Sequence, residues 1–179
     1  MKTPFLLAAA ALCLAVPASA RAQQAPANPV TAVIKELFDR QSQFMIDAAK
    51  EMPAEKYGYQ PTAPQMTFGK IVSHVIGANA AVCRMIADTP APPTMRAADT
   101  DPKEKLVSTL QASFEFCAQA LPKLQDSKMG DPITFFGNEK TTRARAALEL
   151  VADLADHYSQ MASYLRLNNL VPPSAQPKK

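Results

Sequence analysis

Residues 141–173 read TTRARAALELVADLADHYSQMASYLRLNNLVPP, and this stretch carries the clearest structural pattern in the chain. One stripe of side chains recurs at intervals of three and four, which is the spacing of a single helix face. The stripe comprises Leu150, Leu154, His157, Met161, Tyr164 and Leu165. We expect a helix that opens at Thr141-Thr142, runs to about Leu167 and stops before Val171-Pro172-Pro173, because proline cannot continue it.

Three earlier segments show the same spacing. The first covers residues 30–52 and ends where Pro53 disfavours helical geometry in the residue before it. The second covers about residues 68–87, with Thr67 as its N-cap. The third covers about residues 101–121 and starts with an acidic N-cap followed by proline at the first helical position.

Four long helical segments with little else between them indicate an all-α fold, a four-helix bundle. The chain has 179 residues but only five glycines and no tryptophan, which argues against a turn-rich β-sandwich and against a Rossmann or P-loop site. The proline-rich stretch 89–102 predicts a long, exposed crossover between the second and third helices. A second irregular stretch is expected at residues 130–140, with Phe135-Phe136-Gly137 at its apolar centre.

The first residues form a targeting sequence. Lys2 precedes an apolar run at residues 5–16, and Pro17 is followed by two overlapping A-x-A patterns. We expect a secretory signal peptide that is cleaved after Ala22 or, alternatively, after Ala20. The apolar run is too short to span a bilayer comfortably, so no stable membrane insertion is expected after cleavage, and the protein is predicted to be periplasmic or secreted.

The rest of the chain divides into a flexible lead at residues 23–29, the bundle at residues 30–168 and a disordered tail at residues 169–179.

The formal net charge is only +3. Because a nucleic-acid-binding protein usually carries a clear basic excess, we expect no nucleic-acid partner.

Two cysteines, Cys83 and Cys117, remain after removal of the signal peptide at residues 1–22. Two thiols in an exported domain favour a disulfide, since export supplies the oxidant. The alternative is two separate buried thiols. A bridge would close a loop of about 34 residues and stabilise the fold by about 3–4 kcal/mol on the chain-entropy argument.

The candidates for chemistry are two histidines and an acid. Asp153 and His157 are four residues apart, so their side chains lie on one helix face and could ligate one metal ion. Imidazole nitrogen and carboxylate oxygen together suit zinc, nickel, iron or manganese. If His74 points into the same cleft, the three ligands leave positions open for water or substrate. The alternative is a hydrogen bond by which Asp153 merely orients a core imidazole.

Three stretches carry a resemblance to a known family. They are MPAEKYGYQP at residues 52–61, FGKIVSHV at residues 68–75 with Ala78-Asn79 after it, and DHYSQ at residues 156–160 continued by YLRLN and VPP. In these motifs the chain resembles the DinB/YfiT-like four-helix bundle family, over nearly all of the predicted mature sequence.

The resemblance implies an up-down-down-up bundle with a long crossover between helices two and three. It also implies a divalent-metal site of three histidines, one on helix two and an H-x-x-x-H pair on helix four. His74 and His157 match the outer positions, but the middle position is Asp153 here. A carboxylate can still ligate, with a different affinity and metal preference, or the site is vestigial. The positions of Cys83 and Cys117 resemble those of cysteines in exported members, which supports the bridge.

The family includes thiol-dependent transferases and presumed metal-dependent hydrolases. We therefore expect an exported protein with a divalent-metal site at His74, Asp153 and His157, acting as a metal-dependent hydrolase on an unidentified small molecule. A thiol transferase is less favoured, because cytosolic thiol cofactors are scarce outside the inner membrane. The alternative is a non-catalytic module that binds a small molecule or a partner and retains no metal.

Two further residues are candidates for a supporting role. Asp156 could act as an acid or base beside the metal, and Gln160, one turn beyond His157, could hold a metal-bound water. The family resemblance also implies that a homodimer is possible, although no interface stripe stands out in the sequence.

Overall fold

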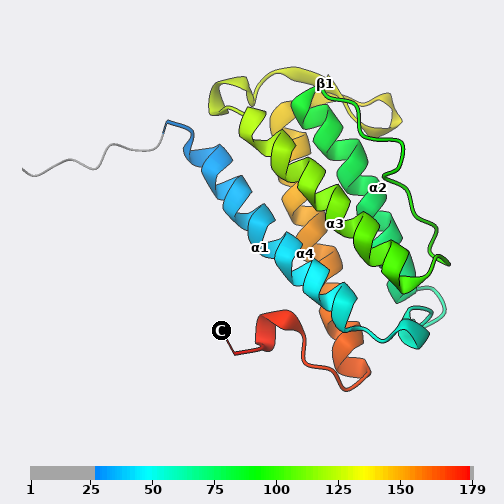
Figure 1. Ribbon diagram of the computed structural model, residues 1–179. Coiled ribbons are helices and arrows are strands. Elements are labelled where there is room, and N and C mark those ends of the chain that lie inside the picture. Colours follow the sequence, from blue (N-terminus) through cyan, green and yellow to red (C-terminus); the bar gives the residue numbers. More distant parts are fainter. Residues whose placement is uncertain (1–26, 178–179) are drawn as a thin grey trace, which may run out of the picture.

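The computed structural model describes residues 27–177 (Figure 1). The predicted signal peptide and residues 23–26 of the predicted lead lie outside this part of the chain. The four long helices are α1 (Pro29–Glu51), α2 (Phe68–Ala87), α3 (Lys103–Ala120) and α4 (Arg143–Leu167). Short 3-10 turns are η1 (Ala54–Lys56), η2 (Leu121–Lys123), η3 (Asp126–Lys128), η4 (Phe136–Asn138) and η5 (Pro173–Ala175). No helix within residues 27–177 combines the length and the apolar character needed to cross a membrane.

The helices form the predicted up-down-down-up bundle. Two contacts between α2 and α3, the Cys83–Cys117 disulfide and the Asn79–Ser113 hydrogen bond, both join residues 34 apart. A constant separation of this kind means that α2 and α3 run parallel. Parallel neighbours need a long connection, and the chain between them returns along the length of the bundle (Figure 1).

Helix α2 has the largest share of buried residues among the four helices. Ten of its 20 residues are buried, because it packs against α3 on one side and α4 on the other. The buried residues are Phe68, Gly69, Ile71, Val72, Val75, Ile76, Asn79, Val82, Cys83 and Ile86. One side of α2 therefore contributes to the core, while His74 lies on its exposed side.

Of the two N-caps predicted from the sequence, the structure confirms one. The Thr67 hydroxyl accepts a hydrogen bond from the Lys70 backbone N–H at 3.1 Å, as expected. The expected cap at Asp101 is wrong, since α3 begins two residues later and no side chain caps it. The Asp101 carboxylate instead accepts from the Ala98 backbone N–H and pairs with Lys105.

The stretch at residues 130–140, expected to be irregular, contributes to an antiparallel hairpin. Strand β1 (Pro132–Thr134) pairs with β2 (Lys140–Thr142) in the described part of the chain. The turn requires φ of +64° at both Gly137 and Asn138, which these residue types tolerate. The fold remains helical, and the hairpin adds a short appendage above α2 and α4.

The expected disordered tail also differs from the structure within residues 169–177. The Ser174 backbone N–H donates to the Tyr158 hydroxyl at 2.9 Å, and the Gln176 amide donates to the Glu51 carboxylate at 3.1 Å. These partners on α4 and α1 supply the ordering contacts that the tail sequence itself does not show.

The disulfide between Cys83 and Cys117 confirms the predicted pairing, and both residues are fully buried. We predict that replacing both cysteines by alanine lowers the free energy of unfolding by about 3–4 kcal/mol, because the unfolded chain regains the entropy of the open loop. Urea denaturation measures the change. A reductant should destabilise the wild-type protein and leave the variant unaffected; equal stability of the variant and the oxidised wild-type protein would contradict the prediction.

Gly69 marks a close approach between α2 and the crossover. A Cβ atom built there lies 2.7 Å from the Asp99 carbonyl oxygen, whereas one built at Gly77 on the same helix meets nothing within 4 Å. We predict that Gly69→Ala destabilises the protein by about 1–3 kcal/mol through overpacking. The matched Gly77→Ala should instead stabilise it by about 0.5–1 kcal/mol through helix propensity. Thermal unfolding separates the two, and similar effects would refute the close approach.

Candidate metal centre

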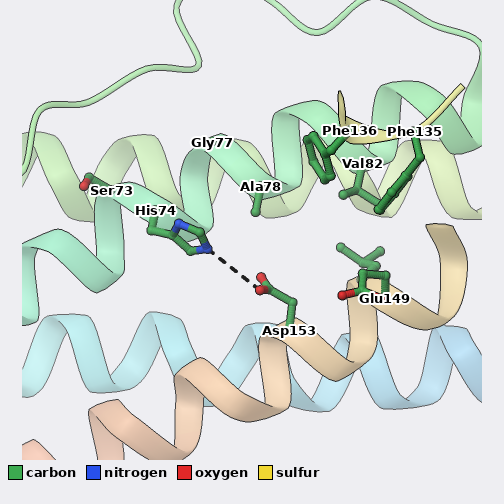
Figure 2. Close-up of a pocket in the computed structure, with 10 residues that line it drawn as sticks. Ser73, His74, Gly77, Ala78, Val82, Phe135, Phe136, Glu149 and Asp153 are labelled. Carbon is green, nitrogen blue, oxygen red and sulfur yellow. Dashed lines mark ion pairs between the residues drawn. The ribbon is translucent and has the colours of Figure 1, made fainter. Parts of the chain in front are cut away.

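Three predicted ligands converge between α2 and α4. His157 Nε2 lies 3.3 Å from Asp153 Oδ1, and His74 Nε2 lies 3.8 Å from the same oxygen. The two imidazole rings meet edge to face with centroids 4.6 Å apart. One ligand atom from each residue can be chosen so that all three lie within 4.8 Å of one another. Figure 2 shows His74 and Asp153 pointing toward each other across the gap between their helices.

The three side chains are positioned partly by the geometry of one helix and partly by the packing of two helices. Asp153 and His157 lie one turn apart on α4, so their alignment is local. His74 lies in the N-terminal half of α2, which runs antiparallel to α4. The convergence therefore depends on how the two helices pack.

The triad is graded in exposure from one side to the other. The His157 side chain is only 8% exposed, Asp153 is 30% exposed and His74 is 44% exposed. An ion held by all three residues would thus have the buried His157 on its inner side. Water or substrate would reach the ion from the solvent side, past His74. Such a site keeps an accessible side for water or substrate.

The charges of the triad stabilise one another. Burial raises the pKa of the Asp153 carboxyl, but the hydrogen bond from His157 and the charges of His157 and His74 outweigh it, so this pKa lies below its usual range. The hydrogen bond to Asp153 raises the pKa of His157, against the opposing effect of burial. Asp153 is therefore ionised at neutral pH, which is the form that ligates metal.

The remaining nitrogen of His157 has polar neighbours. Gln160 Nε2 lies 3.3 Å from His157 Nδ1 and donates to Asp156 Oδ2 at 2.9 Å. Asp156 itself is 3.9 Å from Nδ1, and its side chain is 70% exposed. If Nε2 ligates, Nδ1 carries the proton and needs an acceptor; the Asp156 carboxylate is the neighbouring acceptor, and the Gln160 amide oxygen becomes one if the amide group turns over. Both residues thus lie where a supporting role was expected.

The donor set fits a divalent ion. Ligand atoms about 2.0–2.2 Å from a tetrahedral zinc ion lie roughly 3.3–3.6 Å from one another. The His157–Asp153 distance of 3.3 Å already has this value, and the His74–Asp153 distance of 3.8 Å exceeds it slightly. Two neutral nitrogens and one carboxylate oxygen also match the ligands of open catalytic sites. Aspartate at the middle position is therefore compatible with a metal site.

A neighbouring pocket was not found from the sequence. It extends from His74 and Asp153 toward Phe135 and Phe136, which the hairpin brings over the helices (Figure 2). The one available signal was the unexplained pair of adjacent phenylalanines beside a Gly-Asn turn.

Comparisons with known proteins place the chain in a family. Residues 37–161 match the DinB superfamily. A DinB-like protein from Bacillus subtilis, YjoA, has a similar crystal structure, with a TM-score of 0.64 and 19% sequence identity over 82% of this chain and 99% of that chain. At this identity the likeness shows a shared fold. The search of curated proteins found no match. A family match over most of the chain, joined to the same helical bundle, means that the protein belongs to the DinB superfamily.

Proposed function

We propose that the protein is a metal-dependent hydrolase that holds a divalent ion through His74, Asp153 and His157. The observation that carries this proposal is the meeting of two imidazoles and one ionised carboxylate within 4.8 Å, on a side of the bundle open to solvent. Zinc, nickel, iron and manganese all accept this donor set.

Each residue has a distinct role in the proposal. A divalent ion at this site would act as a Lewis acid and lower the pKa of a water molecule, so that a nucleophile is available at neutral pH. His157 anchors the site because it is buried, and Asp153 supplies the negative charge that offsets the cation. Gln160 orients the His157 ring through Nδ1, while the exposed His74 borders the approach of the substrate.

A non-catalytic binding module remains the second candidate, and one observation favours it. Both imidazole Nε2 atoms approach the same oxygen, Asp153 Oδ1. Asp153 can therefore be satisfied without an ion, by a hydrogen bond from His157 at 3.3 Å and an ion pair with His74 at 3.8 Å. In that case the bundle binds a small molecule beside a vestigial metal site.

Export is part of the proposal. The predicted signal peptide at residues 1–22 supports it, as does the disulfide between Cys83 and Cys117, since disulfides persist in oxidising compartments. An exported hydrolase would meet its small-molecule substrate outside the inner membrane. A homodimer stays a proposal that rests on the family resemblance alone.

A pair of matched substitutions on α4 tests the metal site. We predict that Asp153→Asn weakens Zn²⁺ binding at least about tenfold, because the amide supplies no charge and is a poorer ligand. Asp156→Asn makes the same chemical change three residues further along α4, on an exposed side chain. It should alter Zn²⁺ binding less than Asp153→Asn does. Calorimetric titration of chelator-treated protein with Zn²⁺ measures both, with thermal unfolding as the check on folding.

The outcomes separate the two candidate functions. Equal Zn²⁺ affinity for the two variants, or no binding by the wild-type protein, would refute the triad as a metal centre. Metal binding without any metal-restored hydrolysis of simple esters or amides would refute the hydrolase and leave the binding module. Hydrolysis that chelation abolishes and added metal restores, and that Asp153→Asn lacks, would support the full proposal.

A further inference from the structure

A pocket of about 360 Å³ continues from the triad along the groove between α2 and α4. His74 and Asp153 form one end of it. Its other lining residues are Ser73, Gly77, Ala78, Val82, Phe135, Phe136, Glu149 and Leu150. The volume lies near the lower end of the range for small-molecule sites, roughly 300–1,000 Å³. The pocket therefore adjoins the triad through two of its three residues, His74 and Asp153.

The pocket follows from a stripe on α2. His74, Ala78 and Val82 are spaced by four residues, so they lie on one face of the helix. Ala78 has a side chain too small to fill the groove opposite α4, which leaves space between the ligand His74 and the buried Val82. In Figure 2 the Ala78 side chain points into this space.

The end of the pocket away from the triad is aromatic. The rings of Phe135 and Phe136 meet edge to face with centroids 4.6 Å apart. Phe135 is buried, whereas Phe136 remains 51% exposed although it is a large apolar side chain. The hairpin thus holds an exposed phenyl ring over the pocket, at a position where a bound apolar group would cover it.

The charged groups around the pocket are paired with one another, including the Arg145 guanidinium, which lies 5.8 Å from the centre of the Phe135 ring. The ionised groups among its described lining residues are two carboxylates, Asp153 and Glu149. Each has a partner already: Asp153 faces the imidazoles, and Glu149 Oε2 pairs with Arg145 Nε at 3.0 Å. A charged group of either sign, if buried against these lining residues, would therefore find no unpaired partner of opposite charge, and burying it there is costly.

We propose that this pocket binds the apolar, uncharged part of the substrate, a small aryl or branched alkyl group. The apolar group lies against Ala78, Val82 and the two phenylalanines, and the polar reacting group is held at His74 and Asp153. This inference rests on the proposed function, because it takes the triad as the end where the reaction occurs.

A matched pair of fluorescent probes tests the inference. N-phenyl-1-naphthylamine is neutral, and 8-anilinonaphthalene-1-sulfonate has the same ring skeleton with a sulfonate added. The neutral probe should bind at least about tenfold more tightly, because burying an unpaired charge beside carboxylates is costly. Titration in the presence of a chelator makes this measurement independent of the metal.

Substitutions then locate the probe. Ala78→Phe places a phenyl ring in the pocket and should weaken binding of the neutral probe at least about tenfold, through loss of the space it occupies. Ala112→Phe makes the same change at an exposed position on α3 and should leave binding unaltered. Phe136→Ala removes a half-exposed ring, leaves the core intact and should weaken binding about two- to tenfold. Circular dichroism confirms folding of each variant.

Tighter binding of the neutral probe, weakened by Ala78→Phe and Phe136→Ala but not by Ala112→Phe, would support the pocket. Equal binding of both probes, or neutral-probe binding unaffected by Phe136→Ala and Ala78→Phe, would overturn it. Because the probe is measured without metal, failure here leaves the metal proposal standing. If the wild-type protein binds no Zn²⁺ but still prefers the neutral probe, and the substitutions weaken that binding as expected, the metal proposal alone is refuted.

Discussion

The orientation of α2 about its own axis, which sets the face that each side chain occupies, is the constraint on which the rest of the structure depends. On one side, the buried Cys83–Cys117 disulfide and the Asn79–Ser113 hydrogen bond join α2 to α3 at a constant separation. On the other side, His74 faces α4. Successive residues on a helix diverge by about 100°, so a shift of one residue against α3 would turn His74 away from its partners. The structural core and the candidate site are thus two faces of one helix.

This arrangement gives the candidate site an asymmetric environment. His157 lies within the bundle, where Gln160 approaches its second nitrogen, while His74 lies at the surface. Asp153 stands between them, and its negative charge is matched by the imidazoles around it. Beyond Asp153 the groove becomes apolar as far as the hairpin. A polar cluster of three side chains therefore adjoins an apolar groove, and this combination is common in small-molecule binding sites.

Sequence reasoning failed where the structure gives a residue other partners than its local pattern predicted. Asp101 has the chemistry of an N-cap, but its carboxylate is held by Lys105 and the Ala98 backbone. The tail looked disordered because its composition is polar and proline-rich, yet Tyr158 on α4 offers a hydroxyl to Ser174. The Thr67 cap was predicted correctly, because its hydroxyl accepts from the Lys70 backbone N–H, which is the bond expected of an N-cap.

The sequence alone determined the four helices and the alignment of Asp153 with His157, because both follow from the 3.6-residue period of one continuous helix. The family motifs extended this to the order and direction of the helices. The approach of His74 to that pair, and the position of Phe135 and Phe136 over the groove, were decided only by the tertiary structure. Such contacts join segments far apart in the chain, and their geometry depends on how all the intervening side chains pack rather than on any local spacing.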